Sequence, residues 1–112
     1  MQTINIESGM PTVEQARERL KTDLLKAKKE NKIILKIIHG YGSTGKGGKL
    51  KGAIRKSLVH RRKEKIVKTI IWGEYFTTDK QDTRALLQRH PSLKSDKDLN
   101  RMNEGVTIVE LA

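Results

Sequence analysis

The feature that most constrains how this chain folds is an apolar run that ends in a histidine and a glycine-rich segment, Ile33–Gly48. Five of the six residues from Ile33 to Ile38 are apolar, which predicts a central strand covered well on one face and partly on the other. Five glycines follow His39 within nine residues, and a helical pattern begins near Lys49. In an α/β layout, this order places backbone N–H groups and a helix N-terminus at the carboxyl end of a strand, which suits a phosphate.

Hydrophobic periodicity predicts the other regular elements. Thr3 to Glu7 alternate as a short strand does, and Val13 to Glu30 carry apolar side chains at three- and four-residue spacing, as an amphipathic helix does. Thr12 and Gln15 form a capping-box pattern at the start of that helix. The remaining predicted elements are a second helix from Lys49 to His60 or Arg62, a third strand from Lys65 to Phe76, in which Gly73 marks a bulge or a strand end, and a terminal strand from Val106 to Leu111.

The segment from about Thr77 to Glu104 is the least regular part of the chain. We expect Asp82 to cap a short helix that Pro91 closes, and residues 92–105 to form an exposed polar loop or lid. The chain has 112 residues and shows no repeat, linker or low-complexity tract. We therefore expect one domain over residues 1–112, with an irregular insert at about 77–104.

The order β-α-β-α-β-(α)-β predicts a two-layer α/β sandwich. We expect a four-stranded mixed sheet with the two main helices on one face. The first two strands should be parallel, because a right-handed βαβ unit joins them. The terminal strand should be antiparallel to at least one neighbour, since a long loop connects it to the third strand.

The positive charge of the chain is concentrated after the glycine-rich segment. The net charge is +11, and ten basic residues between Lys46 and Lys68 are opposed only by Glu64. The helix predicted over 13–30 instead mixes acidic residues with its lysines. This localisation favours contact with a polyanion, nucleic acid first, over a face that is merely solvated. A basic face of this density also opposes self-association through it, so a monomer is favoured.

Several classes of site are excluded by composition. The chain has no cysteine, and its three histidines are too dispersed for metal-ligand spacing, so we expect neither a metal nor a cofactor. No apolar run approaches the roughly 20 residues of a membrane span. The first residues, MQTINIESGM, lack the features of a signal peptide. We therefore expect a cytoplasmic protein that makes no membrane contact.

The glycine-rich segment matches nucleotide-binding motifs only in part. It is not a Walker A motif, because Gly47 follows Lys46 where Ser or Thr is required. A G-x-G-x-x-G pattern does begin at Gly40, but Val59 and His60 occupy the positions where the ribose-binding Asp or Glu would lie. The glycines instead allow close approach of a phosphate to the backbone, and a plain glycine-rich turn is the alternative.

Two groups of residues are candidates for contact with nucleic acid. His39 suits phosphodiester contact or general acid–base catalysis, because an imidazole titrates near neutral pH; the alternative is a hydrogen-bonded histidine that anchors the loop. Tyr41 would stack on an exposed base or be a solvent-exposed loop tyrosine. The basic side chains would bind phosphates in a salt-sensitive, sequence-neutral manner. The candidate nucleic-acid-binding residues are Gly40, Tyr41, Gly42, Thr44, Gly45, Lys46, Gly47, Lys49, Arg55 and Lys56.

An ordered set of motifs resembles the small MutS-related (Smr) domain family. The matching segments are the helix start Thr12-Val13-Glu14-Gln15-Ala16, the turn His39-Gly40-Tyr41-Gly42, the segment Thr44-Gly45-Lys46-Gly47 and the terminal strand Gly105–Leu111. The likeness covers nearly the whole chain except the insert. It implies a fold similar to the C-terminal domain of bacterial translation initiation factor three, nucleic-acid binding and, in several members, nicking endonuclease activity on DNA or RNA.

The first strand departs from the family's Leu-Asp-x-His-Gly motif, whose Asp and His are implicated in the nuclease reaction. Asn5 stands where the Asp would be, and Glu7 stands where the His would be. Glu7 is able to act as a base, but Asn5 is not. The resemblance makes His39 and Glu7 the candidate catalytic residues. Three functions stay open: a nucleic-acid-binding domain with nicking activity, a catalytically inactive module that binds structured RNA or an acidic protein, and a binder of small phosphates or nucleotides.

Overall fold

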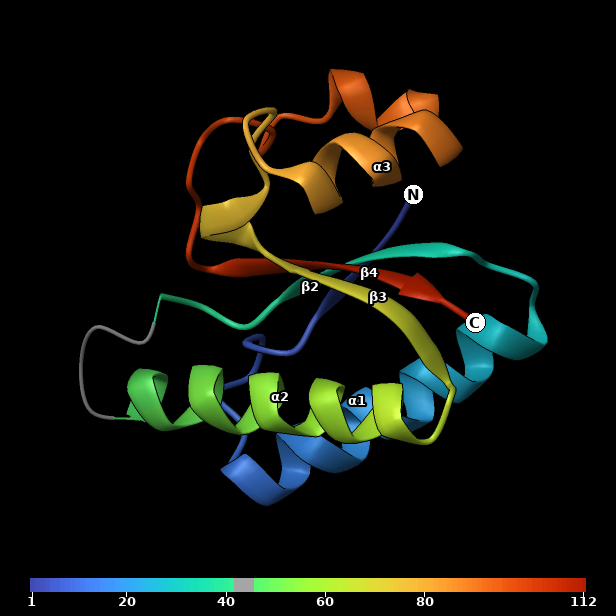
Figure 1. Cartoon of the computed structure of the whole chain (residues 1–112). Coiled ribbons are helices and arrows are strands. Elements are labelled where there is room, and N and C mark those ends of the chain that lie inside the picture. Colours follow the sequence, from blue (N-terminus) through green and yellow to red (C-terminus); the bar gives the residue numbers. More distant parts are fainter. Residues whose placement is uncertain (42–45) are drawn as a thin grey trace.

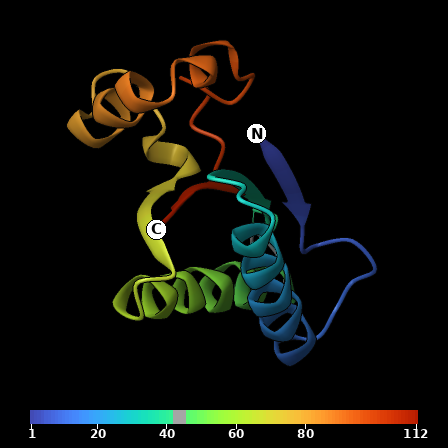
Figure 2. The ribbon, with the colours of Figure 1, turned by 90° about the vertical axis from the view of Figure 1, so that its right-hand side faces the viewer.

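The computed structural model describes residues 1–41 and 46–112, with side chains from Lys49 onward in the second range. A four-stranded sheet lies at its centre (Figure 1). Helices α1 and α2 cover one face of the sheet, and the segment that contains α3 lies over the other (Figure 2). The elements are β1 (Gln2–Asn5), α1 (Val13–Lys29), β2 (Ile34–Ile38), α2 (Lys46–Lys63), β3 (Val67–Trp72), η1 (Gly73–Tyr75), α3 (Gln81–Arg89), η2 (Pro91–Ser95) and β4 (Val106–Leu111).

The sheet has the strand order β1-β2-β4-β3. Strands β1 and β2 are parallel, with Asn5 paired to Ile38, and β4 is antiparallel to both β2 and β3. The predicted mixed sheet, its parallel first pair and the placement of both main helices on one face are confirmed. Gly73 begins η1 directly after β3, so it marks the end of that strand, as predicted.

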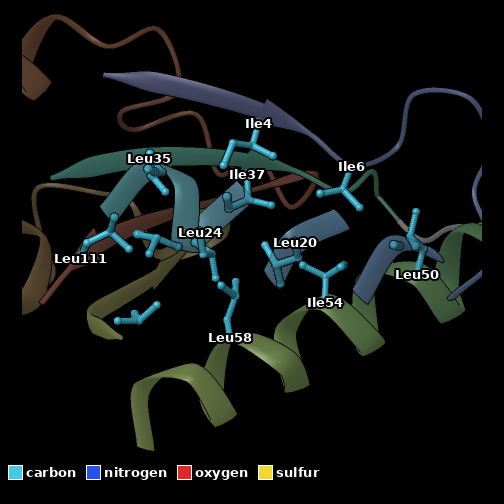
Figure 3. Packing of buried hydrophobic residues seen from close by; sticks show 14 residues of the cluster. Ile4, Ile6, Leu20, Leu24, Leu35, Ile37, Leu50, Ile54, Leu58 and Leu111 are labelled. Carbon is cyan, nitrogen blue, oxygen red and sulfur yellow. The ribbon is translucent and has the colours of Figure 1, made fainter. Parts of the chain in front are cut away.

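The helix face of the sheet carries the larger hydrophobic core (Figure 3). Helix α1 starts at the predicted capping box, in which Thr12 Oγ1 accepts from the Gln15 amide at 3.1 Å and Gln15 Oε1 accepts from the Thr12 amide at 3.0 Å. Such a cap stabilises a helix by about 1 kcal/mol. The apolar stripes of the two helices then pack on strands β1, β2 and β4 through Leu20, Leu24, Ile54, Leu58, Ile4, Ile37 and Val109.

The opposite face of the sheet is covered by residues for which the sequence predicts an exposed loop or lid. That prediction is correct only in part for residues 92–105: most of them are exposed, but Leu93 and Asp98 are buried. A second hydrophobic cluster joins this segment and α3 to β3 and β4 through Ile71, Phe76, Leu86, Leu87, Leu93 and Ile108. All six residues of β4 are consequently buried. The segment contains few apolar residues, so its pattern resembles that of a solvated loop.

Two buried ionic groups hold this cover on the sheet. Lys36 of β2 donates to Asp96 at 2.8 Å and to Asp98. Glu110 of β4 accepts from Arg89 at 2.9 Å and bonds to His90 at 2.8 Å. Burial raises the pKa of Glu110, but its hydrogen bonds from Arg89, Thr69 and His90 outweigh burial and bring that pKa to about 2. Glu110 is therefore ionised at neutral pH.

The boundaries of some elements differ from the sequence prediction. Strand β1 ends at Asn5 rather than at Glu7, and α2 already begins at Lys46. Asp82 is not the cap of α3: Lys80 occupies that position, and Asp82 lies in the first turn. A carboxylate there still interacts favourably with the helix dipole.

Replacing Lys36 with Met should lower the free energy of unfolding by about 3–5 kcal/mol, because Asp96 and Asp98 would stay buried without their cation. Urea unfolding at neutral pH measures this loss. Lys32→Met is the matched control, since Lys32 is an exposed lysine just before the same strand. Adding Asp96→Asn and Asp98→Asn to Lys36→Met should restore stability, and a Lys36→Met protein as stable as the wild type would contradict the prediction.

Candidate functional site

The ends of β1 and β2 bring Glu7 next to Gly40. The amides of Ile6 and Glu7 both donate to the Ile38 carbonyl, at 2.9 and 3.3 Å, which fixes Glu7 beside the end of β2. Gly40 has a φ of +84°, and a Cβ built there would lie 2.0 Å from Glu7 Oε2. The positive φ favours glycine at this position, and a side chain there would also displace the Glu7 carboxylate.

His39 is fully buried, with both ring nitrogens in hydrogen bonds. Nδ1 lies 2.9 Å from the Gly40 carbonyl oxygen, and Nε2 lies 2.9 Å from Thr107 Oγ1. Because a carbonyl only accepts, the proton must be on Nδ1, and Nε2 accepts from the Thr107 hydroxyl. Burial lowers the pKa of His39 to about 4, against the opposing effect of the Gly40 hydrogen bond. The ring is therefore neutral at neutral pH and anchors the start of the loop.

The two candidate catalytic side chains lie on opposite faces of the sheet. His39 bonds to Thr107, which shares the helix face of β4 with Val109. Glu7 instead lines a cavity on the other face together with Thr3 and Lys36. Asn5, the other residue at which the first strand departs from the family motif, accepts a hydrogen bond from the Ser8 amide at 2.9 Å. The structure thus brings Glu7 to Gly40 but does not pair Glu7 with His39, and their catalytic roles stay predictions.

Helix α2 presents a stripe of lysines to solvent. Lys49, Lys56 and Lys63 are exposed and recur every seven residues, which places them on one side of the helix. None of the three has an ion-pair partner among the residues that the structure describes. At about 1.5 Å per residue, the stripe is roughly 21 Å long. That length matches about six phosphates of one strand of a duplex.

Other cations of α2 are already engaged by carboxylates. Arg55 makes a bidentate ion pair with Glu74, at 2.8 and 2.5 Å, and its guanidinium lies 4.7 Å from the ring centre of Trp72. Lys51 Nζ lies 3.6 Å from Glu104. Arg55 was expected to contact phosphates, and in the structure its charge is balanced by Glu74 instead. Exposed Lys56 keeps its charge available to a phosphate.

Other candidate residues lie around the loop. Tyr41 is 63% exposed, and its ring packs beside Gly105, where an added Cβ would lie 3.3 Å from Tyr41 Cε2. Of the three aromatic residues at the end of β3 and in the turn after it, Phe76 is buried, Trp72 is half-buried and Tyr75 is 53% exposed. Gly42, Thr44 and Gly45 lie outside the described residues, and for Lys46 and Gly47 the structure describes the helical backbone alone. The roles of these five residues stay predictions.

Three residues of the site are not among the candidate site residues predicted from the sequence. Thr107 binds the His39 ring, and the Gly105 carbonyl accepts from the amides of His39 and Gly40, both at 3.1 Å. Their role depends on long-range strand pairing, which no local pattern reveals. Lys63 completes the lysine stripe, and its seven-residue spacing from Lys56 was visible in the sequence.

The fold and the site together define a small α/β domain with a mixed sheet and one strongly basic helix. A family model described as the Smr domain matches residues 8–75, and the chain belongs to the Smr domain family. The crystal structure of the Smr domain of Thermus thermophilus MutS2 has the same fold, with a TM-score of 0.61 and 20% sequence identity over 100% of this chain and 99% of that chain. No curated protein matches the sequence.

Smr domains generally bind nucleic acid, and some are nicking endonucleases. The match of the family model includes the glycine-rich segment and α2, and it ends before α3. Over the part of the chain that the structure describes, no helix has the length and apolar character needed to cross a membrane.

The burial of His39 predicts a pH dependence of stability. The unfolded chain binds a proton at His39 near pH 6.5, whereas the folded chain binds it only near pH 4. The unfolded state therefore binds more protons between these values, and stability falls as the pH drops from about 6.5 toward 4. We expect a loss of up to about 3 kcal/mol, measured by urea unfolding across this range.

The variant His39→Gln removes the titrating group and should flatten the dependence over this range. His60→Gln is the control, because His60 is exposed on α2 and its replacement should leave the wild-type dependence intact. The pKa of Glu110 falls from 4.5 to about 2 on folding, so its contribution to stability is lost below about pH 4.5 and overlaps only the acid end of this window. A wild-type stability that is constant from pH 6.5 to 4 would disprove the assignment.

Proposed function

We propose that this domain binds nucleic acid through the phosphate backbone, using the loop that starts at His39 and the exposed face of α2. The observation that carries the proposal is the row of exposed lysines Lys49, Lys56 and Lys63 on a helix without acidic residues. Membership of the Smr family, whose domains generally bind nucleic acid, supports it. The proposed loop contacts are Gly40, Tyr41, Gly42, Thr44, Gly45, Lys46 and Gly47.

The chemistry of this surface suits phosphates rather than base edges. Lysines bind phosphates as point charges and release condensed counterions, so affinity depends steeply on salt and little on sequence. The start of α2 adds the partial positive charge of a helix N-terminus. Since Glu74 already balances the charge of Arg55, phosphate affinity depends more on Lys49 and Lys56 than on Arg55.

Binding should weaken when the lysine stripe is removed. For the triple variant Lys49→Ala, Lys56→Ala and Lys63→Ala, we expect about a ten-fold or greater loss of affinity at low salt for strands of any sequence. The slope of log affinity against log salt should become shallower by about one for each lysine that no longer neutralises a phosphate. Fluorescence anisotropy with single-stranded, duplex and branched DNA and RNA, titrated at several salt concentrations, measures both quantities.

The matched control removes the same number of positive charges from the neighbouring helix α1. Lys21, Lys28 and Lys29 are exposed on α1, and replacing these three with Ala should change affinity far less. Equal losses in the two triple variants would mean that net charge alone, rather than the α2 stripe, governs binding. Wild-type affinity that does not respond to salt would overturn the proposal.

A second candidate function is a catalytically inactive module that binds structured RNA or an acidic protein. The observation that favours it is the state of His39, which is buried, neutral at neutral pH and without a free ring nitrogen. A nuclease would need an accessible acid or base near the scissile phosphate. Glu7 is exposed, but it lies on the other face of the sheet from His39.

A nicking assay separates the enzyme from the inactive module. With supercoiled plasmid or structured RNA as substrate, we expect wild-type protein, His39→Ala and Glu7→Gln to show the same background nicking. Circular dichroism would first establish that both variants are folded. If the wild type nicks the substrate and either substitution abolishes the nicking, the domain is instead an endonuclease, and the substituted residue takes part in its reaction.

A further inference from the structure

A cavity of about 290 Å³ lies on the face of the sheet opposite α1 and α2. The ends of β1 and β2 form one wall, and the segment between η2 and β4 forms the other. Its volume is at the lower end of the roughly 300–1,000 Å³ of small-molecule sites, which suits one nucleobase better than a dinucleotide. The residues that matter for recognition are Thr3, Glu7, Gly40, Tyr41 and Lys97.

We propose that this cavity receives one unstacked base of a bound single strand, and that the Glu7 carboxylate selects guanine there. The proposal rests on the proposed nucleic-acid binding and adds a base-specific subsite to it. Glu7 reads the edge of the base, Tyr41 stacks on its face, and Lys97 contacts a flanking phosphate.

Recognition of a base edge requires a side chain that is held in place and whose polar atoms are free, and Glu7 meets both conditions among the described residues. Its backbone is fixed by the bond to the Ile38 carbonyl, and its carboxylate lies directly over Gly40 at the cavity wall. Among the described residues, that carboxylate takes part in no hydrogen bond or ion pair within the structure. It therefore has two acceptor oxygens available to a ligand.

The preference for guanine follows from donor and acceptor patterns. A carboxylate only accepts, so it pairs best with two adjacent donors. On the Watson–Crick edge, guanine presents N1–H beside the 2-amino group. Adenine and cytosine each present one amino donor beside an acceptor, and thymine and uracil present one N–H between two carbonyls. Of the common bases, only guanine can satisfy both carboxylate oxygens at once.

Tyr41 lies at the entrance to the same cavity. It is 63% exposed, while one edge of its ring packs against Gly105 at the start of β4. The ring is thus held in place yet keeps surface available for stacking, which every base can use. Lys97 is exposed at the rim and, within the described part of the chain, has no ion-pair partner. Residues at the end of β2 line the cavity. Helix α2 begins at that same end of the sheet (Figure 1).

The test measures binding of short labelled oligothymidine or oligouridine strands with one central base varied. We expect the guanine strand to bind about ten-fold more tightly than the adenine and cytosine strands. Inosine lacks the 2-amino group and should lose most of this preference. A 7-deazaguanine strand, changed only on the Hoogsteen edge, should keep it. Fluorescence anisotropy at fixed low salt gives these ratios.

Variants assign the effect to residues. Glu7→Gln should bring the guanine and adenine strands to equal affinity, because an amide offers one donor and one acceptor. Tyr41→Ala should weaken all strands by a similar factor, whereas Tyr75→Ala, which removes another exposed tyrosine, should change nothing. Binding without base preference, or a guanine preference that survives Glu7→Gln, would overturn the subsite alone. Failure of every strand to bind at low salt would overturn the proposed function as well.

Discussion

The burial of β4 between its two neighbouring strands and two covering layers is the constraint on which the rest of the structure depends. Its odd-numbered residues face the helices, and its even-numbered residues face the segment that contains α3. Through Thr107 it fixes the His39 ring, and through Glu110 it holds Arg89 and His90. Both the loop and the cover are therefore positioned by the same buried strand.

Most of the fold could be predicted because its signals are local. The capping box at Thr12, the stripe of α1 and the apolar run of β2 each act within one element, and each was predicted correctly. The cover on the second face could not be predicted, because it depends on pairs such as Lys36 with Asp98, 62 residues apart. A polar segment that buries its charges against a partner strand has the same composition as an exposed loop.

The sequence predicts where the candidate segments lie in the fold, but not how their side chains are arranged. The sequence places the glycine-rich segment and the basic helix at one end of the sheet, since strand, loop and helix follow one another in sequence, and the structure has this order. The state of His39 could not be read in this way, because the Thr107 hydroxyl that binds it is 68 residues away. The same holds for Arg55, whose partner Glu74 belongs to η1. In both cases an expected binding group proved to have a partner within the fold.

The position of Glu7 poses an electrostatic problem that limits how a nucleic acid can approach this end of the sheet. A carboxylate beside the proposed phosphate-binding loop repels any phosphate backbone that passes close to it, at a cost in binding free energy. That cost is offset only if the carboxylate meets hydrogen-bond donors, and a phosphate has none. A base edge does carry such donors. A strand with its phosphates along α2 and one base turned toward the opposite face of the sheet therefore gives partners to both the lysines and the Glu7 carboxylate. In the complex that we propose, the lysine stripe supplies sequence-neutral affinity, and the cavity at Glu7 and Tyr41 supplies discrimination.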